Sequence, residues 1–182
     1  MEKKKIVPLK KLVLASLFIA LDIIFTRFFS VMIPGVERIS LQFLPNALSG
    51  FFLGPIWSVA VLIAGDTLGM VINSAGAAYF PGFTLSAALR GLIYGLVLYN
   101  HKLKYTRTLV AVAIVSVVVD IGLNPVWMSM LYGKGYLATL IAKLPIRAVF
   151  IPAASAIVYF VAKGVIKAVG HSFRSTQNNN TK

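Results

Sequence analysis

Residues 108–131 read TLVAVAIVSVVVDIGLNPVWMSML, and this stretch decides the fold class. It is long enough to cross a bilayer as a helix, which takes about 20 mainly apolar residues. Asp120 is its only charged residue, and Asn124 and Trp127 follow at spacings that place all three on one helix face. A stripe that carries a carboxylate, an amide and an indole is not expected to face lipid. The stretch therefore predicts a transmembrane helix with one face turned towards a protein interior or a polar cavity.

The composition fits a chain made mainly of such helices. The 182 residues are 58% hydrophobic and 13% charged, with a mean hydropathy of +0.84, whereas a soluble domain is typically about 25% charged. We therefore predict an all-α, polytopic membrane protein with one six-helix transmembrane domain at residues 1–171. A polar tail follows at 172–182, which we expect to be disordered. The six predicted spans are 9–29, 39–53, 56–73, 83–99, 108–131 and 136–169.

Lysine and arginine residues set the predicted orientation. They are concentrated before the first span, between the fourth and fifth spans and at the end of the sixth, and they are sparse in the other connections. Because cytoplasmic loops carry the excess of Lys and Arg, both termini are predicted to be cytoplasmic. Their placement at helix ends also accounts for the net charge of +13, so we do not predict nucleic acid as a partner.

Several chemistries are excluded by what the sequence lacks. The chain has no cysteine, so disulfides, thiolate metal sites and cysteine catalysis are excluded. It also has no P-loop, HExxH or GxSxG motif, and we predict neither a metal site nor a cofactor. A membrane receptor is therefore a better interpretation than an enzyme.

Charged residues inside other predicted spans extend the polar stripe around Asp120. Asp66, Arg90 and Arg147 come from three further spans and share roughly its depth, between the membrane midplane and the outer surface. The pairs Asp66–Arg90 and Asp120–Arg147 could be buried ion pairs that only fix helix packing. However, the outer half of the chain carries more cations than anions, which favours an anionic ligand held by arginine.

The predicted outer loop at 73–82 is rich in small residues and carries Tyr79 and Phe80, whose rings offer flat faces to an aromatic ligand. A plain extracellular connector with interfacial aromatic residues would look the same. Trp127, on the polar stripe, favours the stacking interpretation. The candidate substrate-binding residues are Arg27, Asp66, Tyr79, Phe80, Arg90, Tyr94, Asp120, Asn124, Trp127 and Arg147.

Ser16 and Ala20 form a pair of small residues one helical turn apart on the first predicted span. Small residues at this spacing let another helix approach closely, so this pair is a candidate docking site for a partner. Ordinary packing inside the bundle would use the same pattern.

Five short stretches in and around these spans form a distinctive set. They are RISLQFLPN at 38–46, GFFLGP at 50–55, GDTLG at 65–69, FPGFTLS at 80–86 and RGLIYG at 90–95. Together with the six predicted helices and the basic ends, they resemble the S component of an energy-coupling factor (ECF) vitamin transporter, and in particular its folate-type branch. The resemblance extends over most of the chain, from about residue 9 to residue 169.

The resemblance implies a receptor subunit of the bacterial plasma membrane. Such a subunit captures a vitamin with high affinity on the extracellular side and delivers it to a membrane coupling subunit and two ATPase subunits, which are separate chains. Members of the family usually carry an Ala-xxx-Ala motif on the first helix, where they contact the coupling subunit. Here Ser16 takes the first of these positions and Ala20 the second.

Folate would suit the polar stripe chemically. Its pterin ring presents N–H donors that Asp66 or Asp120 could accept, and flat faces for Trp127 or for the aromatic residues of the 73–82 loop. Arg90 and Arg147 would either neutralise the glutamate carboxylates of folate or pair with the aspartates, and the sequence leaves open which does which.

Other functions remain open at this point. The ligand could be another anionic vitamin, such as pantothenate or niacin. The chain could instead be a stand-alone, proton-coupled secondary transporter with Asp66 or Asp120 as proton carrier. A membrane enzyme acting on lipid is disfavoured, because it would need a cluster of metal-binding carboxylates and these two aspartates are isolated.

Overall fold

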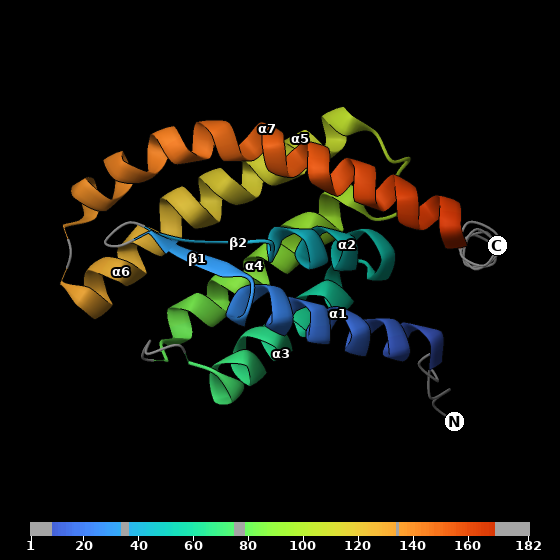
Figure 1. The fold of residues 1–182 in the computed structure, drawn as a ribbon, viewed down its shortest axis with the longest axis horizontal. Coiled ribbons are helices and arrows are strands. Elements are labelled where there is room, and N and C mark those ends of the chain that lie inside the picture. Colours follow the sequence, from blue (N-terminus) through green and yellow to red (C-terminus); the bar gives the residue numbers. More distant parts are fainter. Residues whose placement is uncertain (1–8, 34–36, 75–78, 134, 170–182) are drawn as a thin grey trace, which may run out of the picture.

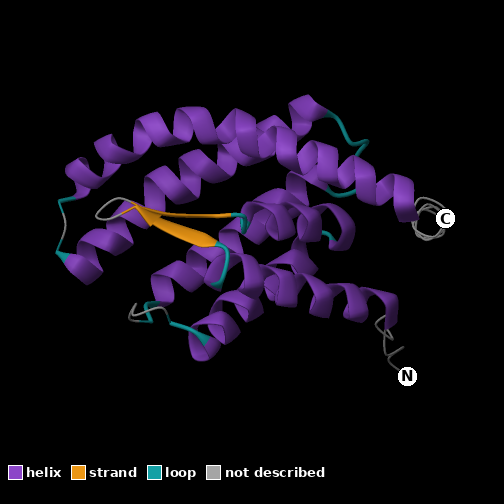
Figure 2. Cartoon of the chain, in the orientation of Figure 1, coloured by secondary structure: helices purple, strands orange, loops and turns teal. Residues whose placement is uncertain are grey.

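The computed structural model describes residues 9–33, 37–74, 79–133 and 135–169, and within these ranges the chain is helical apart from one hairpin and the short connecting loops (Figure 2). The predicted tail at 172–182 lies outside the described residues. The helices are α1 (Leu9–Arg27), α2 (Phe43–Leu53), α3 (Pro55–Ile72), α4 (Pro81–Leu98), α5 (Tyr105–Val115), the π-helix η1 (Ser116–Leu123), α6 (Asn124–Tyr132) and α7 (Tyr136–Val169). The strands are β1 (Ser30–Ile33) and β2 (Glu37–Ser40).

Four helical segments are long and apolar enough to cross a membrane, which confirms the prediction of a helical membrane protein. They are Pro55–Ile72, Pro81–Leu98, Tyr105–Tyr132 and Thr139–Ala168, and they match the third to sixth predicted spans to within a few residues. The first two predicted spans correspond to different kinds of helix. The 19 residues of α1 include four charged side chains, and α2 has only 11 residues.

The prediction that a helix begins at residue 39 is wrong. Residues 37–40 form β2, which pairs antiparallel with β1 so that Ser40 lies opposite Ser30. Helix α2 begins only at Phe43, after a short turn. Residues 30–40 are rich in β-branched residues, which favour strands, but the apolar residues of this stretch alone do not distinguish a strand from a helix.

The fifth predicted span is continuous but changes its winding at its centre. Residues Ser116–Leu123 form the π-helix, and the Asn124 N–H donates to the carbonyl of Val119, five residues back. Pro125 follows at the start of α6 and has no N–H to offer to the helix ladder. This wider turn carries Asp120, and π-turns inside α-helices are frequent at functional sites.

The helices pack closely enough to bring α4 against both α2 and α3. A Cβ atom on Gly95 of α4 would overlap the backbone of Pro55, and one on Gly91 would lie 2.8 Å from the carbonyl of Ser58. In Figure 1, α7 runs alongside α5, α1 runs alongside α3, and α2 and α4 lie between these pairs. Helix α1 begins and α7 ends at the same end of the molecule, and α6 lies at the opposite end (Figure 1).

Candidate ligand-binding site

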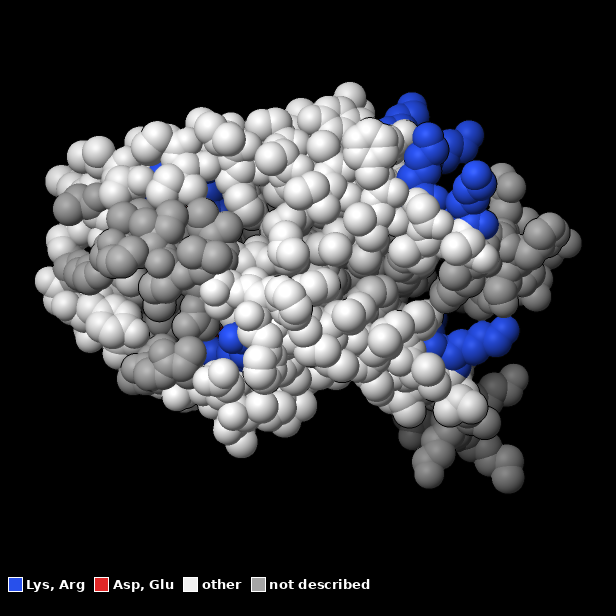
Figure 3. Space-filling model, in the orientation of Figure 1, with Lys and Arg blue, Asp and Glu red and all other residues white. Residues whose placement is uncertain are grey.

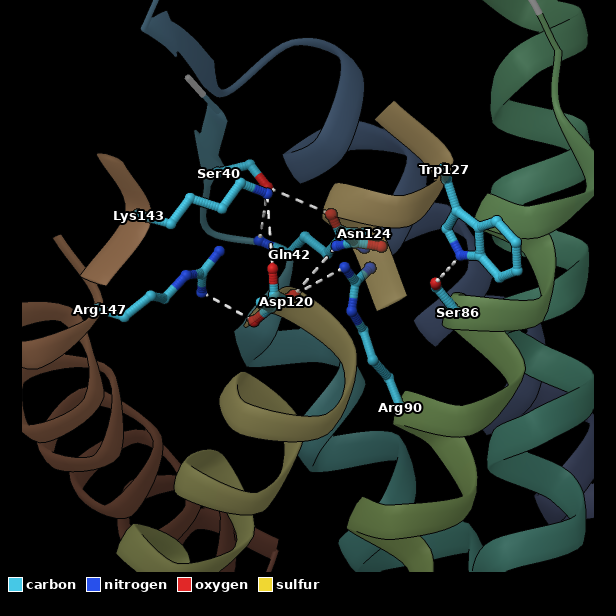
Figure 4. A network of polar contacts seen from close by, with 9 residues as sticks. All are labelled: Ser40, Gln42, Ser86, Arg90, Asp120, Asn124, Trp127, Lys143 and Arg147. Atoms are coloured by element: carbon cyan, nitrogen blue, oxygen red, sulfur yellow. Dashed lines mark hydrogen bonds and ion pairs between the residues drawn. The ribbon is translucent and has the colours of Figure 1, made fainter. Parts of the chain in front are cut away.

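Asp120 is the centre of a group of buried charges. Arg90 of α4 donates from Nη2 to its Oδ1 at 2.9 Å, and Arg147 of α7 donates from Nη1 to its Oδ2 at 2.8 Å (Figure 4). The three side chains are between 8% and 18% exposed. Of the two ion pairs that the sequence left open, Asp120–Arg147 is formed, and Arg90 binds the same carboxylate. Charge-assisted bonds of this kind are about twice as strong as neutral ones.

Lys143 adds a third cation to this group. It lies one helical turn before Arg147 on α7, is 3% exposed, and donates from Nζ to the backbone carbonyl of Asp120 at 3.5 Å. Three cations, Arg90, Arg147 and Lys143, thus lie around Asp120. Lys143 is not among the predicted site residues; its i, i+4 spacing to Arg147 was the signal that could have brought it into the site.

Asn124 completes the group around Asp120. Its amide Nδ2 donates to Asp120 Oδ1 at 3.4 Å, so the predicted pairing of these residues on one helix face is kept across the π-turn. Its Oδ1 is buried and accepts no hydrogen bond from the described part of the chain. The site therefore offers one buried acceptor beside its three cations.

Aromatic residues lie next to this charged group. Trp127 of α6 donates from Nε1 to Ser86 Oγ of α4 at 3.0 Å, which fixes the indole against α4 (Figure 4). The Phe80 ring, at the start of α4, has its centroid 5.8 Å from that of Trp127. Gly82 leaves room for both rings, because a Cβ at this position would lie 2.6 Å from Trp127 Cδ2 and 2.5 Å from Phe80 Cε1.

Asp66 belongs to a second polar group, between α1, α3 and α4. Its Oδ2 accepts a hydrogen bond from Thr84 Oγ1 at 2.7 Å, and the same hydroxyl lies 3.3 Å from Tyr79 Oη. Arg27 of α1 donates from Nη2 to the backbone carbonyl of Asp66 at 3.4 Å. Three of the predicted site residues, Arg27, Asp66 and Tyr79, are thus brought together, while Tyr79 remains 54% exposed.

Asp22 is a buried carboxylate that sequence reasoning did not assign to the site. It is 3% exposed, and Asn46 of α2, with its amide oriented to satisfy its neighbours, donates to Asp22 Oδ1 at 2.9 Å. Arg90, Asp66 and Arg27 are the charged side chains that act on it. Asp22 therefore lies between the two polar groups. The signal was present, since it is an acidic residue in an apolar stretch, as Asp66 is.

The remaining predicted residues lie away from these contacts. Tyr94 is 2% exposed and packs in a hydrophobic cluster with Phe43 and Leu98, and its contact with substrate stays a prediction. Ser16 and Ala20 lie on an exposed face of α1, and Ser16 Oγ donates to the carbonyl of Leu12, one turn back.

The apolar helices and the buried, positively charged centre define a multi-pass membrane protein with an internal polar site. Residues 10–173 match the family described as "ECF transporter, substrate-specific component". The chain belongs to this family, as its sequence motifs predicted, and it is a multi-pass protein of the bacterial cell membrane. The family consists of transporter components that bind substrate rather than of enzymes.

Individual relatives show the same relationship. The chain is 40% identical to the folate transporter FolT of Clostridium novyi (strain NT) over 144 residues, which cover 79% of this chain and 83% of that protein. A crystal structure of FolT bound with folic acid matches with a TM-score of 0.79 and 32% identity, over 85% of this chain and 93% of that one. The S component for biotin from an ECF-type ABC transporter shares the fold, with a TM-score of 0.65 and 16% identity over 90% and 95% of the two chains.

Proposed function

We propose that this chain captures folate on the extracellular side of the membrane and delivers it to an ATP-driven ECF transporter complex. The observation that carries the proposal is the group of three cations around Asp120, next to the Phe80–Trp127 aromatic pair. The chain has this site in a fold that it shares, at 32% identity, with a FolT structure that holds folic acid.

The cationic side chains account for binding of an anion. Arg90 and Arg147 bind the two oxygens of Asp120, and Lys143 donates to its backbone carbonyl, so the site gathers three cationic donors at one place. Arginine and lysine donors bind carboxylates through charge-assisted hydrogen bonds, so a ligand that brings one or two carboxylates suits this site. The glutamate part of folate supplies two such groups.

The aromatic pair accounts for binding of a flat ring. The indole N–H of Trp127 is bonded to Ser86 Oγ, so the orientation of the ring is fixed before a ligand binds. Offset or tilted stacking of aromatic rings contributes about 0.5–1.5 kcal/mol beyond the burial of their area. The free Oδ1 of Asn124 and the carboxylates of Asp22 and Asp66 supply acceptors for the N–H groups of a pterin.

In this proposal the chain crosses the membrane six times, with both termini in the cytoplasm. Helices α1 and α2 supply the two crossings beyond the four long apolar segments. Two observations support the orientation. Helix α1 begins and α7 ends at one end of the molecule (Figure 1), and the Lys and Arg side chains drawn in Figure 3 gather mainly at that same end. Positive residues in excess mark the cytoplasmic side.

The proposal also includes partners. The exposed Ser16–Ala20 face of α1 docks onto the membrane coupling subunit, where small residues allow close approach of the helices. Two ATPase subunits of the complex supply the energy by hydrolysing ATP, and this chain itself performs no catalysis.

Tryptophan fluorescence tests the proposal, because the chain has two tryptophans in different surroundings. Trp127 lies in the site, whereas Trp57 packs against a hydrophobic cluster whose buried residues come mainly from α1, α2 and α3. Folate added to the purified protein in detergent should quench the emission saturably, and pantothenate should not. The quenching should persist in Trp57→Phe and be lost in Trp127→Phe. Saturable quenching by pantothenate but not by folate would make pantothenate the ligand in place of folate. The absence of any quenching would reject the proposed site.

A further inference from the structure

A second site lies at the end of the molecule where α4 ends and α5 begins. An open depression of about 800 Å³ is formed there by the last turn of α4, the connecting loop and the first two turns of α5. Lys102, Lys104 and Arg107 line it together with the apolar side chains of Leu96 and Val110. None of these residues takes part in the Asp120 site.

The connecting loop is held in a defined shape. Asn100 has a φ of 56°, in the left-handed region, which turns the chain sharply after α4. A ring nitrogen of His101 lies 2.7 Å from the carbonyl of Tyr99, and the side chain of Thr108 bonds the carbonyl of Lys104. The lysines on this loop are therefore presented at fixed places rather than on a long flexible segment.

The depression has cations but no acidic lining residue within the described part of the chain. Lys102 and Lys104 are exposed. Arg90 and Arg147, in contrast, are bound to the Asp120 carboxylate. Charge of one sign in a concave surface attracts an anion.

The depression is also lined by two exposed apolar side chains, Leu96 and Val110. Leu96, in the last turn of α4, is 61% exposed, and Val110, in the second turn of α5, is 50% exposed. Both helices belong to segments that cross the membrane. A free phosphate would use only the cations, whereas a lipid would use the cations and these apolar side chains together.

Aromatic residues place this region at the membrane interface. Tyr105, the first residue of α5, has its ring centroid 6.1 Å from that of Tyr159 on α7. Lys163 Nζ lies 5.9 Å from the Tyr159 ring, so α7 brings a fourth cation close to the same end. Tyrosine rings are enriched at the level of lipid headgroups, with lysines reaching past them into the polar layer.

We propose that this depression binds an anionic phospholipid. The headgroup phosphate contacts Lys102, Lys104 and Arg107, and an acyl chain runs along Leu96 and Val110. The site requires only that the chain lies in a membrane, so it is independent of the proposed folate function. It anchors the loop between α4 and α5 to the lipid surface on the side where α1 begins and α7 ends.

Native mass spectrometry of the full-length protein tests this proposal. The protein is reconstituted with equal parts of dioleoylphosphatidylglycerol and dioleoylphosphatidylcholine, extracted in detergent, and the retained lipid is counted. We compare it with Lys102→Gln/Lys104→Gln/Arg107→Gln and with the control Lys10→Gln/Lys11→Gln/Lys167→Gln. The control loses the same charge at residues that do not line the depression.

The unmodified protein and the control should retain phosphatidylglycerol at least tenfold over phosphatidylcholine. The triple variant should retain at least tenfold less phosphatidylglycerol, since each basic residue contributes roughly fivefold to binding of acidic lipid. Equal retention of the two lipids, or unchanged retention in the triple variant, would overturn the proposal. So would displacement of the lipid by millimolar inorganic phosphate, which would indicate a site for free anions.

A milder change guards against misfolding of the triple variant. Leu96→Ser keeps all the cations and alters only the apolar floor, so it should weaken retention of the dioleoyl lipid and leave a short-chain, dihexanoyl phosphatidylglycerol unaffected. Equal effects on both lipids would mean that no acyl chain lies on Leu96 and would contradict the proposal.

Discussion

Gly65 of α3 faces the Asp22 carboxylate of α1 so closely that a methyl group at position 65 would overlap Asp22 Oδ2. Both residues are buried, and Asn46 holds the other carboxylate oxygen at 2.9 Å. The carboxylate therefore has little freedom to move away. Helix α1 depends on this contact to approach α3, and through it the polar residues of α1 and α3 are brought together.

Gly65→Ala should therefore destabilise the protein. Adding a methyl group to a well-packed interior typically costs about 1–3 kcal/mol, so the Tm in detergent should fall measurably. The matched control is Gly164→Ala in α7, where an added Cβ would meet nothing within 4 Å. Alanine is favoured over glycine in a helix by up to about 1 kcal/mol, and the control should be neutral or slightly stabilised. Equal Tm values for the two variants would contradict the close contact.

Asp120→Asn should be the most damaging single change in the polar centre. It removes the negative charge that binds Arg90 and Arg147 and leaves these buried cations without that carboxylate. Removing one partner of a buried ion pair typically costs about 3–5 kcal/mol. Thermal unfolding followed by intrinsic fluorescence should show a large loss of stability.

Asp66→Asn is the comparison for that experiment. Asp66 accepts a hydrogen bond from Thr84, and an asparagine amide oxygen can still accept it, so the loss should be near that of one weakened hydrogen bond, about 1 kcal/mol. If the two variants were destabilised equally, the central role given to Asp120 would be wrong.

The membrane character and most of the charged site could be predicted from the sequence. Asp120, Arg90 and Arg147 stand out because each interrupts an apolar stretch, and hydrocarbon tolerates such residues only where they face an interior. Their pairing could not be predicted. Which arginine reaches which aspartate depends on how α4, the π-turn and α7 cross, and helical spacing carries no information on crossings between helices.

The hairpin and Asp22 were missed for different reasons. Residues 37–40 contain one apolar residue, the β-branched Ile39, which suits a strand or the start of a helix, and the pairing with β1 that decides between them is a tertiary contact. Asp22 carries the same signal as Asp66, an acidic residue inside an apolar stretch, but it was not included among the candidate residues. Its bond to Asn46, between α1 and α2, shows that it belongs to the buried polar residues.

Gly82→Ala should weaken folate binding with little effect on folding. A Cβ at this position would push against the rings of Phe80 and Trp127 at their near edges, so the pair would have to move apart. We expect the Kd for folate to rise at least tenfold, about 1.4 kcal/mol, as measured by fluorescence titration.

Ser86→Ala provides a graded comparison for the aromatic pair. It removes the hydrogen bond that orients the Trp127 indole but adds no bulk, so the Kd should rise by less than in Gly82→Ala, in line with about 1 kcal/mol for one hydrogen bond. Unchanged folate affinity in both variants would remove Phe80 and Trp127 from the site.

Ser16→Trp/Ala20→Trp should separate assembly from ligand binding. Both residues lie on the exposed face of α1, whereas Phe18 between them is 5% exposed and packs into the protein, so large side chains fit at 16 and 20 without disturbing the fold. Folate affinity and Tm should stay as they are. The variant should, however, co-purify poorly with the coupling subunit and lose ATP-driven folate uptake in proteoliposomes, because bulky side chains prevent the close approach that small residues allow.

Ala153→Trp, on an exposed face of α7, is the control for a bulky aromatic residue elsewhere and should assemble normally. Full assembly of the double variant would show that the coupling subunit contacts another face of the chain.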